Sequence, residues 1–231
     1  MYQLFIANKN YSSWSLRPWV LMKALGIEFE ERLVPFEAEN FERYRHFSPN
    51  GLVPCLHDGE IRVWDSFAIV EYLAERHPGV WPSDAPARAF ARSAAAEMHA
   101  GYGTLRAICT MNCGVRARPK EMTPALQRDI ARFCEVWTEG LQRFGGPFLA
   151  GSDFTAVDAF FAPVAYRVQT YGLELPPEAA AYAERLRQFP AMREWYEAAM
   201  AEPWREPGHE AEIAAVATII ADERQAVPAS S

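Results

Sequence analysis

Three serines, Ser12, Ser13 and Ser15, lie in the segment YSSWS between a predicted strand and a predicted helix. A hydroxyl group at this place can donate a hydrogen bond to an anion, and the positive end of a helix dipole favours negative charge there too. Serine is also a preferred N-cap residue, so all three could be ordinary turn or cap residues. The segment predicts either an anion-stabilising hydroxyl or plain helix capping.

Two more segments in the first half of the chain could contact a ligand. In the first, Val53 and Pro54 begin an apolar run; in the second, Asp65 and Ser66 precede a helical pattern. A serine at a helix start offers its hydroxyl and free backbone N–H groups to a carboxylate. A capping serine and an ordinary trans proline at a strand edge would explain the same residues without a ligand.

The second half carries one comparable motif. Thr155 and Asp158 have the spacing of a capping box, in which each side chain satisfies a backbone N–H group at the start of a helix. We therefore expect these two residues to be structural rather than catalytic.

The elements that would position these groups alternate up to about Gly79. Two apolar runs around Asp58-Gly59 predict a hairpin. Pro18 fits a helix only in its first turn, which places that helix start near Ser13 to Ser15. The predicted order is strand, helix, strand, hairpin and helix, over residues 2–7, 15–25, 29–34, 53–63 and from residue 66.

A proline-containing stretch over residues 80–88 predicts a linker. Beyond it the apolar spacing is helical, and no strand is expected. The predicted helices cover residues 88–113 (bent near Gly101), 126–144, 155–171, 190–200 and 209–225, before a frayed tail.

The composition excludes several classes of partner. The 231 residues have a formal net charge of −7, and no basic cluster is present that would suit a nucleic acid or an anionic membrane surface. No stretch reaches the roughly 18 consecutive apolar residues of a membrane-spanning helix. A small-molecule partner is the better expectation.

The start of the sequence lacks the features of a secretory signal, so a cytoplasmic location is expected. The four cysteines should then be free thiols. Cys109 and Cys113 would share a helix face, but no His or second Cys pair has zinc-ligand spacing. We predict buried thiols and no metal.

Taken in order, the serine segment, the P-x-G-x-V-P run before Cys55, the Asp65-Ser66 run and the T-x-x-D box resemble the cytosolic glutathione transferase family. The SS-x-S-x-R run from Ser12 to Arg17 resembles its zeta class, the maleylacetoacetate isomerase group. The resemblance implies an α/β thioredoxin-like domain over 1–79, an all-helical domain over 89–231, glutathione as co-substrate and a homodimer. Detoxification of small electrophiles is the function implied.

The resemblance also implies roles for individual residues. The catalytic hydroxyl, five residues before Arg17, is Ser12, with Ser13 and Ser15 as rivals. A free thiol has a pKa of about 8.5, so a hydroxyl donating to the sulfur would increase the thiolate fraction at neutral pH.

The other implied residues hold the glutathione peptide. A cis bond before Pro54 would leave the backbone of Val53 to pair with glutathione as another strand would. Ser66 would receive the γ-glutamyl carboxylate, and Asp65 would supply the charge opposite its ammonium group.

Several positions depart from the zeta pattern. Trp14 replaces a cysteine, which disfavours a glutaredoxin-like disulfide reductase. Leu52 stands where the class has a glutamine, and Asp65 stands where it has a glutamine or a glutamate. Thr170 stands where the class has a substrate-binding arginine. Arg167, one turn earlier on the same helix face, could substitute for that arginine, but a solvated surface residue is the expectation. These departures favour a transferase over an isomerase, with a non-catalytic ligand- or protein-binding relative as a further alternative.

The electrophile would bind between the two domains. Candidates for the lining, with no role assigned, are His99, Tyr102, Arg106, Met111 and Asn112.

Overall fold

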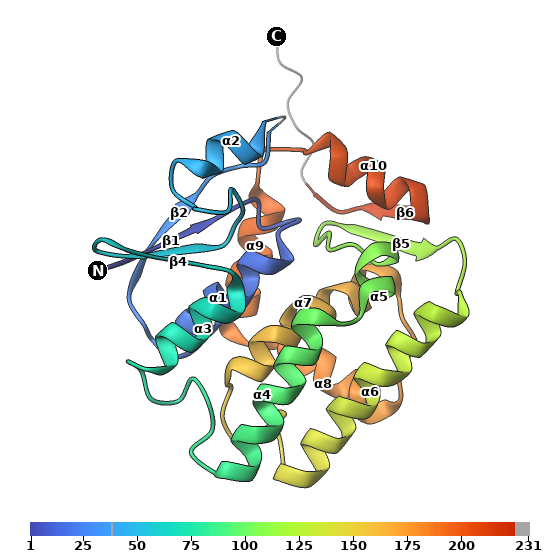
Figure 1. The fold of residues 1–231 in the computed structure, drawn as a ribbon. Coiled ribbons are helices and arrows are strands. Elements are labelled where there is room, and N and C mark those ends of the chain that lie inside the picture. Colours follow the sequence, from blue (N-terminus) through green and yellow to red (C-terminus); the bar gives the residue numbers. More distant parts are fainter. Residues whose placement is uncertain (38, 225–231) are drawn as a thin grey trace.

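The computed structural model describes residues 1–37 and 39–224. A mixed-sheet domain is followed by a mostly helical one, which confirms the predicted fold class (Figure 1). The N-terminal elements are β1 (Tyr2–Ile6), α1 (Ser13–Ala24), β2 (Phe29–Leu33), α2 (Asn40–Arg45), β3 (Cys55–Asp58), β4 (Ile61–Trp64) and α3 (Ser66–Ala74). The C-terminal elements are α4 (Ala85–Ala100), α5 (Gly103–Ile108), β5 (Val115–Pro119), α6 (Pro124–Phe144), α7 (Ala156–Tyr171), α8 (Pro177–Gln188), α9 (Pro190–Ala201), α10 (Pro207–Val216) and β6 (Ala217–Asp222).

The N-terminal sheet has the strand order β2-β1-β3-β4. β1 is parallel to β2 and antiparallel to β3, and α1 makes the crossover between the parallel pair. The predicted hairpin is present: β3 and β4 are antiparallel, and Gly59 takes a φ of +58° in the turn. This arrangement brings the loop after β1 and the segment before β3 to the same end of the sheet.

The helix α1 begins at Ser13, within the predicted window. Pro18 is its sixth residue rather than part of its first turn, so the helix continues through a position without a backbone N–H. The first turn contains no acidic residue, so the helix itself supplies no carboxylate at its positive end.

The expectation that the second half would contain helices only is wrong in one respect. β5 and β6 form a two-stranded antiparallel sheet, and about a hundred residues of sequence separate them. Burial alternates along β5, where the buried Val115 and Ala117 are each followed by a more exposed arginine. The terminal helix α10 is correspondingly short, ending at Val216; the predicted end at residue 225 and the predicted tail lie outside the described residues.

Two boundaries also differ from prediction. α4 begins at Ala85, inside the stretch 80–88 expected to be a linker, where Asp84 caps it by accepting from the N–H of Ala87. The helix expected over 88–113 is interrupted at Gly101, where a Cβ atom would lie 2.7 Å from the carbonyl oxygen of Glu97. A separate helix, α5, follows.

The helix α7 is the common wall of the two domains. It packs against α1 of the N-terminal domain and against α4 and α8 of its own domain, and nearly all of its residues are buried. At its start the capping box predicted for Thr155 and Asp158 is present. Near its other end it carries Arg167, which is also buried.

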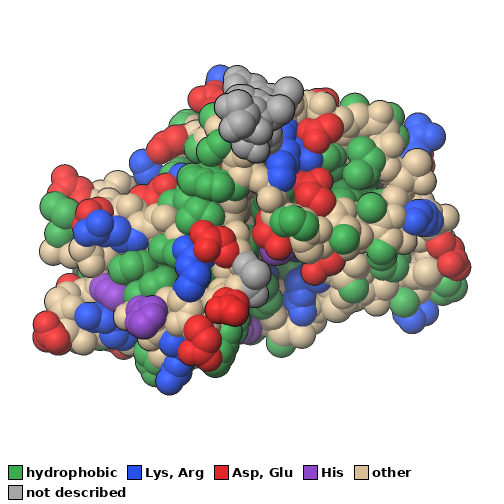
Figure 2. Space-filling model, turned by 90° about the horizontal axis from the view of Figure 1, so that it is seen from above, with side chains coloured by type: hydrophobic (Ala, Val, Ile, Leu, Met, Phe, Trp, Pro, Cys, Tyr) green, Lys and Arg blue, Asp and Glu red, His purple; other side chains and the backbone are tan. Residues whose placement is uncertain are grey.

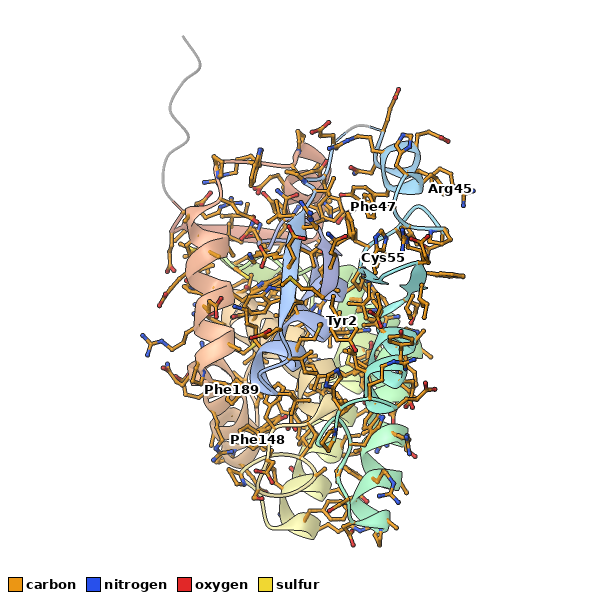
Figure 3. All side chains as sticks on the ribbon, turned by 90° about the vertical axis from the view of Figure 1, so that its left-hand side faces the viewer. Tyr2, Arg45, Phe47, Cys55, Phe148 and Phe189 are labelled. Atoms are coloured by element: carbon orange, nitrogen blue, oxygen red, sulfur yellow. The ribbon has the colours of Figure 1, made fainter. Side chains whose placement is uncertain are left out.

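Figure 3 labels Phe47 in the N-terminal domain and Phe148 and Phe189 in the helical domain. Phe148 and Phe189 meet edge to face, with ring centroids 5.9 Å apart. Phe47 lies beside β3, where its carbonyl oxygen accepts from Cys55 Sγ at 3.4 Å. This bond ties the segment before the hairpin to the sheet.

No helix in the described ranges is long and apolar enough to cross a membrane. Acidic and basic side chains are intermingled on the face that carries α2 and α10, seen from above (Figure 2). The face that carries α2 and α10 therefore has charges of both signs rather than an electrostatic potential of one sign.

The end of α9 supports the loop that follows β1. The Glu202 carboxylate accepts from the backbone N–H groups of Lys9 at 2.5 Å and Asn10 at 3.2 Å. The indole of Trp195 donates to the carbonyl oxygen of Lys9 at 2.9 Å. The helical domain therefore fixes the turn that leads to the serine segment.

Burial raises the pKa of the Glu202 carboxyl from 4.5 to about 7, against the lowering effect of the two backbone hydrogen bonds. The folded protein then holds this proton at pH values where the unfolded chain has lost it. We expect the Glu202 contribution to the free energy of unfolding to fall as pH rises from 4.5 to 7, by up to about 1.4 kcal/mol per pH unit. Urea unfolding across this range should show a flatter profile for Glu202→Gln; identical profiles would contradict the assignment.

Candidate functional site

A cavity of about 750 Å³ lies between the two domains. The loop after β1, the segment before β3 and the start of α3 form one side, and the helical domain forms the other. The lining residues used below are Tyr11, Ser12, Ser13, Trp14, Phe36, Val53, Pro54, Asp65, Ser66, Arg106, Met111, Arg167, His209 and Glu212. All five residues assigned from the sequence, Ser12, Val53, Pro54, Asp65 and Ser66, are among them.

The three serines of the loop have different environments. Ser12 donates to Ser15 Oγ at 2.7 Å, and Ser15 Oγ also accepts from the backbone N–H of Ala7 at 3.3 Å. Ser13 Oγ instead accepts from Arg167 Nη2 at 3.3 Å. Ser12 and Ser13 line the cavity, whereas Ser15 lies fully buried behind them.

Plain capping does not account for Ser12. It occupies the N-cap position of α1, yet its side chain makes no capping hydrogen bond. The first N–H groups of α1 therefore have no side-chain partner at the N-cap, and an anion in the cavity would meet the positive end of this helix.

Val53 and Pro54 form the edge of the cavity next to β3. The bond between them is cis, as the resemblance implied. Among the described residues, no hydrogen bond involves the N–H or C=O of Val53. An extended peptide could use both groups in the manner of an added strand.

Asp65 and Ser66 lie where β4 turns into α3. Asp65 caps α3 by accepting from the N–H of Phe67 at 2.7 Å, and its φ of +74° is unusual for a residue with a side chain. Its other oxygen lies 3.5 Å from His99 Nε2. Ser66 is fully buried, and its Oγ accepts from Arg17 Nη1 at 3.4 Å.

The prediction that Arg167 is a solvated surface residue is wrong. Its exposed fraction is 3%, because α7 directs it into the interface with α1. Burial lowers its pKa to about 10. Thr170, one turn later, does not line the cavity and donates to the carbonyl oxygen of Asn112 at 2.7 Å.

The candidates for an electrophile site separate into two groups. Arg106 and Met111 line the cavity. His99 lines a different cavity between α3 and α4. Tyr102 and Asn112 are buried and face other protein groups, with Tyr102 donating to Glu97 Oε1 at 3.1 Å.

Part of the lining comes from α10, which the sequence analysis did not connect with the site. The His209 ring stacks on Tyr11, at 5.0 Å between centroids, and on Phe36, at 4.8 Å. The Tyr11 hydroxyl donates to Glu210 of the same helix. Burial first, and then Glu210, raises the pKa of Tyr11 to about 12, so its proton is retained by this contact.

The cysteines are not placed for chemistry in the cavity. All four are buried free thiols, as predicted, and none lines the cavity. Burial raises the pKa of Cys55 to about 11 and that of Cys109 to about 12. Within residues 1–37 and 39–224, no group of three or more His, Cys, Asp or Glu side chains could hold a metal ion.

The family of glutathione S-transferase N-terminal domains matches residues 11–76, and the family of the C-terminal domains matches residues 114–198. The zeta-class glutathione S-transferase of Euphorbia esula is 31% identical over 159 residues, which cover 66% of this chain and 70% of that protein. The probable maleylacetoacetate isomerase of Vibrio cholerae is 26% identical over 194 residues, covering 78% and 89% of the two chains.

A solved structure with the same fold supports this relationship. A glutathione transferase homologue from Burkholderia, crystallised with bound glutathione, has a TM-score of 0.64 and 22% identity, covering 86% of this chain and 97% of the other. The matched domains, the sequence similarity and the two-domain architecture agree, and the chain belongs to the glutathione S-transferase family.

Proposed function

We propose that this protein conjugates the thiolate of glutathione to small electrophiles, as a cytoplasmic enzyme of detoxification. The observation that carries the proposal is the convergence on one cavity of Ser12, the Asp65-Ser66 pair and the backbone of Val53, which has no hydrogen-bond partner among the described residues. These groups match a thiol, a peptide backbone and a γ-glutamyl end in one extended ligand.

In this proposal each end of glutathione has its own partner. Val53 pairs with the peptide backbone, with Pro54 beside it, while Ser66 and the start of α3 receive the γ-glutamyl carboxylate. Asp65, with a side-chain exposure of 43%, attracts the neighbouring ammonium group. Retention on immobilised glutathione, followed by a panel of electrophiles, tests the proposal; a protein that is not retained and turns over none of them would refute it.

Ser12 is the proposed donor to the thiolate. Its hydroxyl lies at the cavity and at the N-cap of α1, but its proton is directed to Ser15. Rotation about the Cα–Cβ bond would bring the O–H group to the sulfur, at the loss of one neutral hydrogen bond. A hydrogen bond to an anion is stronger than one between neutral groups, so the exchange is favourable.

A second candidate activity is glutathione-dependent cis-trans isomerisation. It is favoured by the similarity to the maleylacetoacetate isomerase relative of Vibrio cholerae. Addition of the same thiolate would begin that reaction, so the site serves both. Trp14 and Thr170 depart from the isomerase pattern, and maleylacetone in the substrate panel separates the two activities.

We also propose that the protein is a homodimer, with the second copy covering the surface of β4. Trp64 and Ile61 are 44% and 48% exposed there. Trp64 lines a cavity of about 690 Å³ between β4, α3 and α4, whose lining also includes Val63 and Phe67. Exposed apolar side chains beside a hollow are typical of an interaction surface.

Light scattering at micromolar concentration should therefore give twice the 26.1 kDa mass of the chain. Trp64→Glu should shift the mass to that of the monomer, because it places a charge in an apolar contact. Trp204→Glu is the matched control, since Trp204 is equally exposed but lies after α9. A monomeric wild-type protein would refute the proposal.

A further inference from the structure

Two buried arginines reach the serines of the cavity from behind. Arg17 of α1 donates to Ser66 Oγ at 3.4 Å, and Arg167 of α7 donates to Ser13 Oγ at 3.3 Å. Arg17 is fully buried and Arg167 is 3% exposed. Each serine therefore has its oxygen, rather than its proton, engaged with a guanidinium group.

The guanidinium group of Arg167 is held in place by hydrogen bonds, but one of its donors has no partner among the described residues. Its Nε donates to the carbonyl oxygen of Cys109 at 2.7 Å, which fixes the guanidinium plane. Its Nη1 is buried and has no hydrogen-bond partner among the described residues. The Arg167 residue is also part of the cavity lining.

The charge around Arg167 is also unbalanced. Burial first, and then the positive charges of Arg167 and Arg106, lower the pKa of Arg17; burial first, and then Arg106, lower that of Arg167. Asp65 is the acidic group that acts on Arg17. Buried positive charge with so little compensation costs free energy in the empty protein, and an anion in the cavity offsets that cost.

The hydrogen bond from Arg167 determines what Ser13 can do. A serine hydroxyl has one proton and two lone pairs, and one lone pair here accepts from the cation. No acceptor for the Ser13 proton is found among the described residues, so that proton is available to the cavity. Accepting from a cation also polarises the O–H group and makes it a better donor.

We propose that Ser13 is a second hydroxyl donor to the glutathione thiolate, and that Arg167 is the positioning residue that holds and polarises it. This inference rests on the proposed function. The thiol loses its proton to solvent and keeps the electron pair on sulfur, which then accepts from Ser12 and Ser13. The Ser13 proton has no acceptor among the described residues, whereas the Ser12 proton must first turn from Ser15.

The test is the pKa of the bound thiol, read from thiolate absorbance against pH with glutathione bound. We expect Ser13→Ala to raise it by about one unit, the loss of one hydrogen bond to an anion. Arg167→Met should raise it at least as much, and Arg167→Lys should restore part of the difference. The double variant Ser13→Ala/Arg167→Met should match Arg167→Met alone, because the two residues act as one unit.

Thr170→Val is the control for general loosening. Thr170 is buried on the same helix and holds the neighbouring segment through Asn112, but it does not line the cavity. It should leave the thiol pKa unchanged. Ser13→Ala and Arg167→Lys keep the test decisive if Arg167→Met does not fold.

The outcomes separate this inference from the proposed function. A thiolate band in the wild type with unchanged pKa in Ser13→Ala and Arg167→Lys would overturn the inference alone. A change confined to the KM of an acidic electrophile would also overturn it, and would assign Arg167 to binding that substrate. Absence of the band from the wild type, with no retention on glutathione, would overturn both.

Discussion

Ser12→Ala should still bind glutathione but should hold its thiol with a pKa about one to two units higher than the wild type. The proposed contacts with Val53, Asp65 and Ser66 would hold other parts of glutathione, whereas the variant would lose one hydrogen bond to an anion. Turnover at neutral pH should fall roughly tenfold to a hundredfold and recover partly as pH rises, because the loss is mainly in thiol ionisation. Thiolate absorbance and kcat against pH measure both effects.

Ser15→Ala is the informative control for Ser12. Ser15 is fully buried, does not line the cavity, and accepts the Ser12 proton in the structure. Its removal should therefore leave the thiol pKa unchanged or lower it, because Ser12 loses its alternative acceptor. An unchanged thiol pKa in Ser12→Ala would show that another group ionises the thiol.

Asp158→Ala should lower the free energy of unfolding by about 3–4 kcal/mol. The Asp158 carboxylate is fully buried and accepts from the N–H groups of Leu149 at 3.0 Å and Thr155 at 2.9 Å, and from the Tyr182 hydroxyl at 2.7 Å. Alanine leaves these three donors without their partner in a site that excludes water. Urea unfolding, compared at equal m values, measures the loss.

Asp153→Ala is the matched control for Asp158. Asp153 lies in the loop just before α7, is exposed, and accepts from the neighbouring Ser152. Its replacement should change stability by less than about 0.5 kcal/mol. Asp158→Asn should fall between the two, since its amide oxygen can still accept while its NH₂ group faces donors. Equal stability of Asp153→Ala and Asp158→Ala would contradict the structural role.

Local sequence patterns were sufficient to predict an element wherever a short stretch of sequence determines its own backbone geometry. The hairpin around Asp58-Gly59 follows from strand alternation and a turn that glycine permits. The capping box of Thr155 and Asp158 follows from a three-residue spacing. The order of the motifs, through the family resemblance, then brought residues from three such segments into one predicted site.

Patterns that depend on distant pairing were not recovered. The alternation in β5 is too short to identify a strand without β6, which lies about a hundred residues later. The contribution of α10 to the cavity was missed for the same reason, because the contact of Glu210 with Tyr11 joins the two ends of the chain.

The sequence by itself determined the two-domain order, the hairpin, the capping box and the serine segment at the start of α1, because each depends on neighbours within a few residues. Only the tertiary structure decided how the polar groups of that segment are used. From the sequence of its own helix, Arg167 is expected at the surface, but it is buried because α7 packs against α1. The direction of a hydroxyl proton depends on the groups that folding brings within 3–4 Å, and Ser13 and Arg167 are 154 residues apart in the chain.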